Sequence, residues 1–146
     1  MASIVLFHSA LGVTSSVRSF AGALAQDGHD VLTADLFDGE TFQTVEDGVR
    51  KRDSLGIPEL MRRAQAAVEA APRDSIYAGF SMGAAAAQFL AANRPGARGA
   101  VLMHAVLPLA ALGLESWPSV PVQIHTTEAD PWVDIPVREA FAKASR

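Results

Sequence analysis

Five short apolar runs, separated by intervals of helix length, constrain the fold of this chain more than any other feature. Each run has the length of a strand and is nearly continuous in apolar residues, which is typical of strands covered on both faces. The intervals between the runs are long enough for crossover helices and too long for hairpins. The runs are Ile4–Phe7, Val31–Ala34, Ile76–Ala78, Ala100–Met103 and Val120–Ile124. The sequence therefore predicts an α/β fold with a mainly parallel sheet of about five strands.

Helix-forming features fill the intervals between these runs. Serine caps, proline in a first turn and apolar residues at helical spacing mark them. The expected helices run from Ser15 to about Gln26, from Pro58 to before Pro72, from Met82 to about Asn93, and onward from Pro136. We interpret the mixed stretch from Asp35 to Ile57 as a surface excursion, and its cluster Arg50-Lys51-Arg52-Asp53 as a solvated face. Helices on both faces of the sheet would give a three-layer sandwich.

Length and composition fit one globular domain over residues 1–146. Hydrophobic residues make up 49% and charged residues 19% of the chain, which excludes a disordered chain. A net charge of −4 leaves no basic stripe, so neither nucleic acid nor a membrane surface is an expected partner. Without cysteine there is no disulfide, thiolate nucleophile or zinc-thiolate site, and we expect no metal. No basic region precedes the apolar start, so we expect no secretory signal and a cytoplasmic location.

The segment that carries chemistry is Gly79-Phe80-Ser81-Met82-Gly83, a G-x-S-x-G sequence. It follows a predicted strand and precedes a predicted helix, which is the context that a nucleophile elbow requires. The sharp turn would present the Ser81 hydroxyl at the carboxyl end of the sheet, beside the free N–H groups of a helix start. The alternative is a tightly packed glycine–serine turn without chemistry.

A second oxyanion donor is expected from the loop after the first strand, His8-Ser9-Ala10-Leu11-Gly12. The backbone N–H of Ala10 is best placed to supply it. His8 and Ser9 would then line the same pocket. Polar residues at a strand end are equally often satisfied loop groups, and both interpretations stay open.

The acid of a catalytic triad is expected after a later strand. Glu128-Ala129-Asp130-Pro131 follows the fifth apolar run, and Asp130 is the candidate that would orient an imidazole. The alternative is an Asp-Pro turn that opens the last helix. Glu128 and Asp134 are competing candidates for the acid.

Taken together, these segments resemble the dienelactone hydrolase family of α/β-hydrolases over nearly the whole chain. The resemblance implies Ser81 as nucleophile, Asp130 as triad acid, and the N–H groups of Met82 and Ala10 as the oxyanion hole. It implies no cofactor, and a small ester, lactone or thioester as substrate. The segments that carry it are residues 4–12, Ala34-Asp35-Leu36-Phe37-Asp38-Gly39, Tyr77-Ala78-Gly79-Phe80-Ser81-Met82-Gly83 and Glu128-Ala129-Asp130-Pro131.

Two departures from the family pattern affect this interpretation. Founding members use a cysteine nucleophile and an acidic residue in the first loop, where this chain has Ser81 and Ser9, so dienelactone itself is a doubtful substrate. The family's catalytic histidine follows one further strand after the acid, and no histidine follows Asp130. We therefore expect residues 1–146 to lack the C-terminal segment with that histidine, and to show little turnover alone.

The four histidines differ in their expected positions. His29 is expected at the amino-end face of the sheet, far from Ser81. His125 is expected with its side chain between the sheet and a helix. His104 ends a strand on the correct face and could contact a ligand; reach from His104 or His8 to Ser81 is conceivable.

Two function hypotheses follow from these features. The first is a serine hydrolase that cleaves a small ester, lactone or thioester through an acyl-enzyme. The second is a catalytically silent α/β-hydrolase-like binding or interaction domain, which the missing histidine favours. Arg18, Arg62 and Arg63 could attract a substrate carboxylate, or could belong to a solvated helix face. We expect a monomer or a homodimer.

Overall fold

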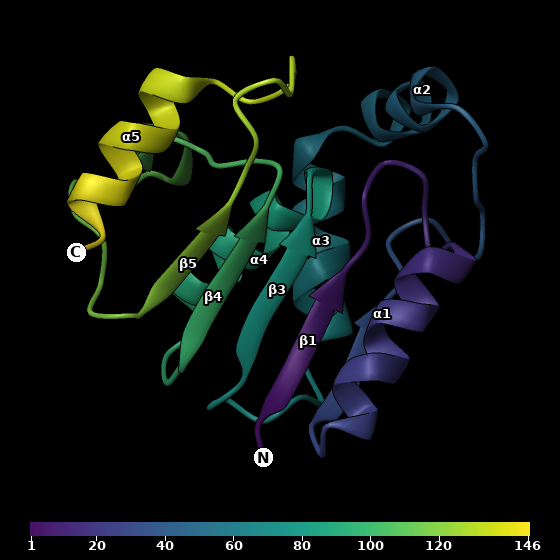
Figure 1. Ribbon diagram of the computed structural model, residues 1–146, viewed down its shortest axis with the longest axis horizontal. Helices are drawn as coiled ribbons and strands as arrows, with labels where there is room; N and C mark the ends of the chain where they lie inside the picture. The colour runs from purple at the N-terminus through teal and green to yellow at the C-terminus, as the bar shows by residue number, and fades with distance from the viewer.

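A five-stranded parallel sheet runs through the centre of the molecule (Figure 1). The computed structural model describes residues 1–146. Every neighbouring pair of strands is parallel, in the order β2-β1-β3-β4-β5. The strands are β1 (Ser3–Phe7), β2 (Asp30–Ala34), β3 (Ile76–Phe80), β4 (Gly99–Met103) and β5 (Val122–His125). All five predicted strands are present, and the predicted α/β-hydrolase-like fold is confirmed.

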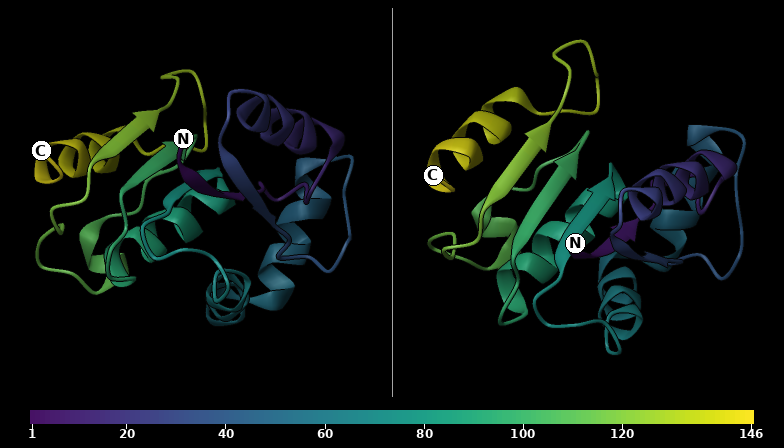
Figure 2. Two further views of the ribbon diagram at one scale, coloured as in Figure 1. Left: turned by 90° about the horizontal axis from the view of Figure 1, so that it is seen from below. Right: turned by 60° about the horizontal axis from the view of Figure 1, so that its bottom comes forward.

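Helices cover both faces of this sheet. α1 lies on one face, and α3 and α4 lie on the other (Figures 1 and 2). α5 lies beside β5 at the edge of the sheet, and α2 lies beyond the carboxyl ends of the strands. The helices are α1 (Ser15–Gln26), α2 (Val45–Leu55), α3 (Ile57–Ala67), α4 (Met82–Asn93) and α5 (Ile135–Ala144), with a short 3-10 helix, η1 (Leu109–Leu112). None of these helices has the length and apolar character needed to cross a bilayer.

Two apolar clusters form the core, one on each face of the sheet. The smaller joins Val13 and Val17 to the strands beneath α1. The larger contains the buried residues of α3 and α4 and extends to Phe141 of α5, whose ring packs edge-on against Trp117. α4 is buried on most sides, as its nearly continuous apolar sequence predicts. This central helix is therefore fixed against β1, β3 and β4, directly behind the G-x-S-x-G turn.

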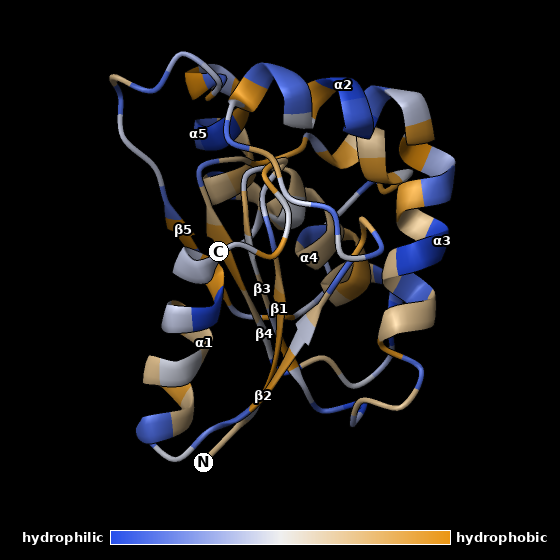
Figure 3. Ribbon diagram, turned by 90° about the vertical axis from the view of Figure 1, so that its right-hand side faces the viewer, coloured by the Kyte–Doolittle hydropathy of each residue, from blue (hydrophilic) through white to orange (hydrophobic).

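The stretch from Asp35 to Ile57, predicted as a surface excursion, contains the helix α2. Thr44 accepts a hydrogen bond from the N–H of Asp47 and caps its first turn. Hydrophilic residues cover much of α2 (Figure 3), and Gly48 is its one buried residue. With so little apolar periodicity, the helix gives only a weak sequence pattern. A Cβ on Gly48 would collide with the carbonyl of Ala10, so α2 approaches the loop after β1 very closely.

Candidate active site

Ser81 lies between the last residue of β3 and the first residue of α4. Its backbone has φ 54° and ψ −111°, a left-handed conformation that is strained for any residue with a Cβ. Two backbone hydrogen bonds hold it there: the Ser81 N–H donates to the carbonyl of Met103 at 2.7 Å, and its carbonyl accepts from Ala84 at 2.9 Å. The turn has the strand-turn-helix form predicted for a nucleophile elbow.

The two glycines of the motif are required by close backbone packing. A Cβ on Gly79 would collide with the backbone of Gly83. A Cβ on Gly83 would collide with the carbonyl oxygens of Phe7 and His8. Gly79 thus lets the chain turn back on itself, and Gly83 lets α4 pass directly over β1. Both positions are fixed by backbone contacts, which leave no room for a side chain to adjust.

A cavity of about 570 Å³ opens in front of Ser81. Its lining comes from loops at the carboxyl ends of β1, β3, β4 and β5, together with α1 and α2. This is the edge of a parallel sheet where ligands bind in open α/β folds. The lining includes five residues singled out from the sequence, namely Ser9, Ala10, Ser81, His104 and Asp130. These residues come from four separate loops and are brought together at one site.

The two expected oxyanion donors come from different elements, and only Ala10 is among the residues that line the cavity with Ser81. Met82 is the first residue of α4, and Ala10 follows β1 by three positions. Neither backbone N–H donates a hydrogen bond to another group of the chain. Neighbouring bonds shape the loop of Ala10: Ser9 Oγ accepts from Leu11 N–H at 3.2 Å, and Ser9 O accepts from Gly12 N–H at 3.1 Å. Both N–H groups are thus free to donate to a ligand.

Asp130 lies on the loop between β5 and α5, with its side chain only 20% exposed. Its Oδ1 accepts a hydrogen bond from Trp132 N–H at 2.9 Å, and its Oδ2 lies 3.7 Å from Nδ1 of His104. The helix that follows is capped by Asp134, whose carboxylate accepts from Val137 N–H at 3.1 Å. Glu128 points into solvent, 83% exposed. Of the three acids, Asp130 is the one that lines the cavity with Ser81.

His8 does not line this cavity, and this corrects one of the two interpretations left open above. The side chain is fully buried and packs against the ring of Phe37. Its Nε2 accepts a hydrogen bond from Leu36 N–H at 2.8 Å, so the other nitrogen, Nδ1, carries the proton and donates to Ser9 O at 2.6 Å. Burial lowers the pKa of His8 below its ordinary value of 6.5, against the opposing effects of its bond to Ser9 and of Asp35. With both nitrogens engaged, His8 is a structural residue and cannot take a proton from Ser81.

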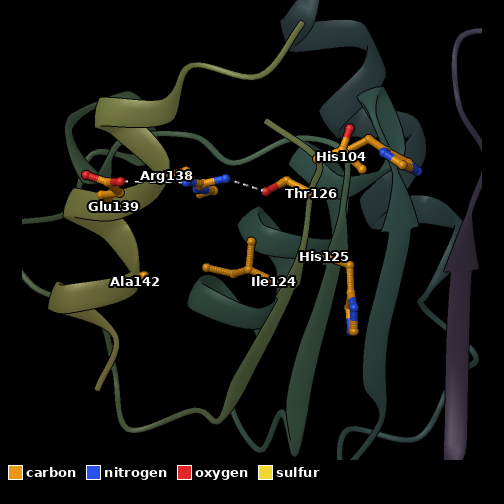
Figure 4. Close-up of a pocket in the computed structure, with 8 residues that line it drawn as sticks. His104, Ile124, His125, Thr126, Arg138, Glu139 and Ala142 are labelled. Carbon is orange, nitrogen blue, oxygen red and sulfur yellow. Dashed lines mark hydrogen bonds and ion pairs between the residues drawn. The ribbon is translucent and has the colours of Figure 1, made fainter. Parts of the chain in front are cut away.

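His104 is the histidine that lines the cavity with Ser81. It follows β4 directly and has φ +69°, so it shares with Ser81 a strained left-handed backbone. Its N–H donates to the carbonyl of His125 at 2.8 Å. Figure 4 shows the His104 ring directed away from α5 and toward the neighbouring strands. Two of the three strained non-glycine residues therefore lie at adjacent strand ends around this site.

The remaining histidines lie elsewhere. Nδ1 of His29 accepts a hydrogen bond from Ala2 N–H at 3.1 Å, which places it at the amino-end face, as predicted. His125 is exposed, contrary to the prediction that it lies between the sheet and a helix. It borders a second hollow of about 480 Å³ between β5 and α5, which His104 also lines and across which Arg138 donates to Thr126 at 2.9 Å (Figure 4).

Most of the basic side chains singled out from the sequence are paired with acidic side chains. Arg62 and Arg63 both donate to Glu59 and hold the pKa of its carboxyl down at about 2. Neither they nor Arg18 lines the cavity, so the suggestion that they attract a substrate is not supported. In the basic cluster, Arg50 pairs with Asp47 and Lys51 with Glu40.

Several lining residues were not anticipated from the sequence, among them Arg52, Phe20 and Trp132. Each lies on a segment that looks like ordinary helix or loop surface, so no local pattern identifies it. No group of three or more His, Asp or Glu side chains is placed to hold a metal ion.

Comparison with known proteins assigns the chain to a family. A model of the dienelactone hydrolase family matches residues 1–146. The chain belongs to the dienelactone hydrolase family. No curated protein sequence matches it.

Solved structures with the same fold agree with this membership. A dienelactone hydrolase-like promiscuous phosphotriesterase from metagenomic libraries aligns with a TM-score of 0.83 at 23% identity, over 99% of this chain and 64% of its own. A protein named m3DLH aligns with a TM-score of 0.76 at 25% identity, over 97% of this chain and 63% of its own. A Xanthomonas campestris protein assigned to the α/β-hydrolase superfamily aligns with a TM-score of 0.62 at 23% identity, over 99% and 82%. The chain thus spans somewhat less than two thirds of the first two relatives.

Proposed function

We propose that this protein is a serine hydrolase that cleaves a small ester, lactone or thioester through an acyl-enzyme. The observation that carries the proposal is the strained Ser81 elbow, which opens into one cavity with Asp130 and the loop of Ala10. Family membership supports a hydrolase, and the serine mechanism and the substrate class are the proposal.

In the proposed reaction, Oγ of Ser81 attacks the substrate carbonyl carbon and loses its proton to an imidazole. The tetrahedral oxyanion accepts hydrogen bonds from the N–H groups of Met82 and Ala10, at the amino terminus of α4. The C–O or C–S bond to the leaving group then breaks, and the imidazole returns the proton to the departing oxygen or sulfur. Water, deprotonated by the same imidazole, releases the acid and restores Ser81.

Asp130 is the proposed partner of that imidazole. Its carboxylate would hold the ring in the productive tautomer and stabilise the imidazolium. The family resemblance points to a histidine after a strand that follows the acid, and no histidine follows Asp130 in this sequence. Within residues 1–146, His104 is the imidazole beside Asp130. The test measures ester turnover by residues 1–146 with and without the substitution His104→Gln. Loss of turnover in the variant would make His104 the base, and unchanged turnover would exclude it.

The decisive variant for the proposal is Ser81→Ala in the full-length protein. We expect loss of ester hydrolysis by about three orders of magnitude or more, because the nucleophile is removed. The matched control is Ser19→Ala, an exposed serine of α1 outside the cavity, which should keep wild-type turnover. Intact turnover in Ser81→Ala would refute the assignment.

A catalytically silent α/β-hydrolase-like binding domain is the second candidate function. A fluorophosphonate reagent separates the two candidates, since an activated serine reacts with it much faster than an ordinary serine does. Modification of Ser81 in the full-length protein supports the hydrolase, and an unmodified Ser81 supports the binding domain.

A further inference from the structure

Several exposed large apolar side chains of this protein lie together at the cavity in front of Ser81. Beyond the first residue, five such side chains are exposed, and three of them, Phe20, Val45 and Trp132, line the cavity in front of Ser81. Single exposed apolar residues are ordinary on a protein surface. Three of five at one cavity, from three different segments, indicate a surface that binds an apolar group.

These residues belong to an apolar wall that reaches the nucleophile. Phe20 projects from α1, and its ring packs edge-on against Phe80 with the ring centres 5.1 Å apart. Phe80 immediately precedes Ser81. Val45 and Val49 add apolar surface from α2, so eight of the fifteen lining residues are hydrophobic. The wall is therefore continuous from the exposed rim to the reacting serine.

Polar or charged residues make up the other seven of the fifteen lining residues. Arg52 is its one lysine or arginine side chain, and its Nε already donates to Asp53 at 3.0 Å. Asp130 and His104 lie near one another on the opposite loops. The side of the cavity formed by α1 and α2 thus offers mainly apolar contact to a bound substrate.

We call this surface the α1–α2 wall; it consists of Leu11, Val17, Phe20, Val45, Val49 and Phe80. We infer that the α1–α2 wall and Trp132 bind the acyl group of the substrate. The protein then prefers esters of apolar acids over acetates. The inference rests on the proposed function, because the acyl group is defined by attack of Ser81. Each methylene group that leaves water on this wall should raise kcat/KM about fourfold.

The first test compares p-nitrophenyl hexanoate with p-nitrophenyl acetate in the full-length protein. We expect kcat/KM to be at least about tenfold higher for hexanoate, since four added methylene groups are partly buried. Phe20→Ala and Trp132→Ala should each lower the hexanoate-to-acetate ratio, by about threefold or more. Ile57→Ala and Leu32→Ala remove exposed apolar side chains outside the cavity and should leave the ratio unchanged.

The second test measures binding without chemistry. N-methylhexanamide and N-methylacetamide present the two acyl groups on an amide that is not hydrolysed on the time scale of a titration. Trp132 is exposed at the cavity and Trp117 is buried away from it, so a shift of tryptophan emission to shorter wavelength reports on the cavity. We expect the hexanamide to bind at least tenfold more tightly, and Phe20→Ala to weaken its binding.

The outcomes separate this inference from the proposed function. Equal binding of the two amides, or a ratio of esters that Phe20→Ala does not alter, would overturn the α1–α2 wall as the acyl site. Preferential binding of the hexanamide together with undiminished hydrolysis in Ser81→Ala would support the wall and refute Ser81 as nucleophile.

Discussion

The elbow around Ser81 and the loop around Asp130 meet at one cavity, yet they are held in very different ways. At the elbow, backbone packs on backbone, and two glycines have no space for a Cβ. The loop of Asp130 is mostly exposed, and the carboxylate is fixed by one hydrogen bond from Trp132 N–H and by its contact with His104.

This difference predicts how each region responds to substitution. The nucleophile sits on closely packed backbone, so changes to its supporting glycines should act on stability. The acid sits on a segment with few supports, so changes there act on chemistry and leave the fold intact. Substitutions at the elbow should therefore lower the free energy of unfolding, and substitutions at Asp130 should lower activity without unfolding the protein.

The largest effect is expected for Gly83→Ala. The added Cβ meets the carbonyl oxygens of Phe7 and His8, at the end of β1, an inner strand paired on both sides, so this backbone cannot move aside cheaply. We expect a loss of free energy of unfolding of about 3 kcal/mol or more, or no folded protein, measured by urea denaturation.

The matched control for Gly83→Ala is Gly22→Ala, within α1, where a Cβ meets nothing within 4 Å. This change should stabilise the protein by up to about 1 kcal/mol, because alanine is the better helix former. Equal stability of the two variants would show that the elbow is not closely packed.

Asp130→Asn should lower activity strongly and change stability little, the reverse of what is expected for Gly83→Ala. We expect ester hydrolysis by the full-length protein to fall about 10²- to 10⁴-fold, since the amide no longer stabilises an imidazolium. The free energy of unfolding should change by less than about 1 kcal/mol, because one partly exposed hydrogen bond is affected.

Two neighbouring acids serve as controls for Asp130→Asn. Glu128→Gln changes an exposed side chain, and Asp134→Asn keeps an N-cap that asparagine forms equally well. Both should keep turnover within about twofold of wild type. If either loses as much activity as Asp130→Asn, the assignment of the acid is wrong.

The smallest expected effect is a pH dependence of the free energy of unfolding that comes from His8, whose carbonyl oxygen packs against Gly83 of the elbow. Burial lowers the pKa of His8 in the folded protein, whereas the unfolded chain titrates near 6.5. Below that pH the unfolded chain binds more protons than the folded one, so the free energy of unfolding should decrease as pH falls. Urea midpoints at pH 7.5 and 5.5 measure this decrease.

His8→Gln should lose stability at pH 7.5 and show a smaller decrease on going to pH 5.5. His29→Gln, at the opposite end of the sheet, should keep the wild-type decrease. An unchanged pH dependence in His8→Gln would mean that another group controls it.

The sequence predicts the sheet and the elbow because both follow from local patterns. Apolar runs mark the strands, and the glycines of G-x-S-x-G record the close packing around Ser81. α2 was missed because its buried contact is made by a glycine, Gly48, which contributes no apolar periodicity. The environment of His8 depends on Leu36, 28 positions away, whose N–H occupies the ring nitrogen. Such long-range pairing leaves no local pattern.

The cavity itself was only partly predictable. Ser81, Ala10, Ser9, His104 and Asp130 stand at expected strand ends, so topology brings them together. Phe20 and Trp132 join them only because α1 and the loop before α5 pack over the same edge of the sheet.

The most direct test of the central claim is the site of covalent modification by a fluorophosphonate in the full-length protein. The account predicts one phosphonyl group per chain, located by peptide mass spectrometry on Ser81, and none on Ser81→Ala. Modification of a different residue, or none on the wild-type protein, would contradict the claim that Ser81 is the nucleophile of this site.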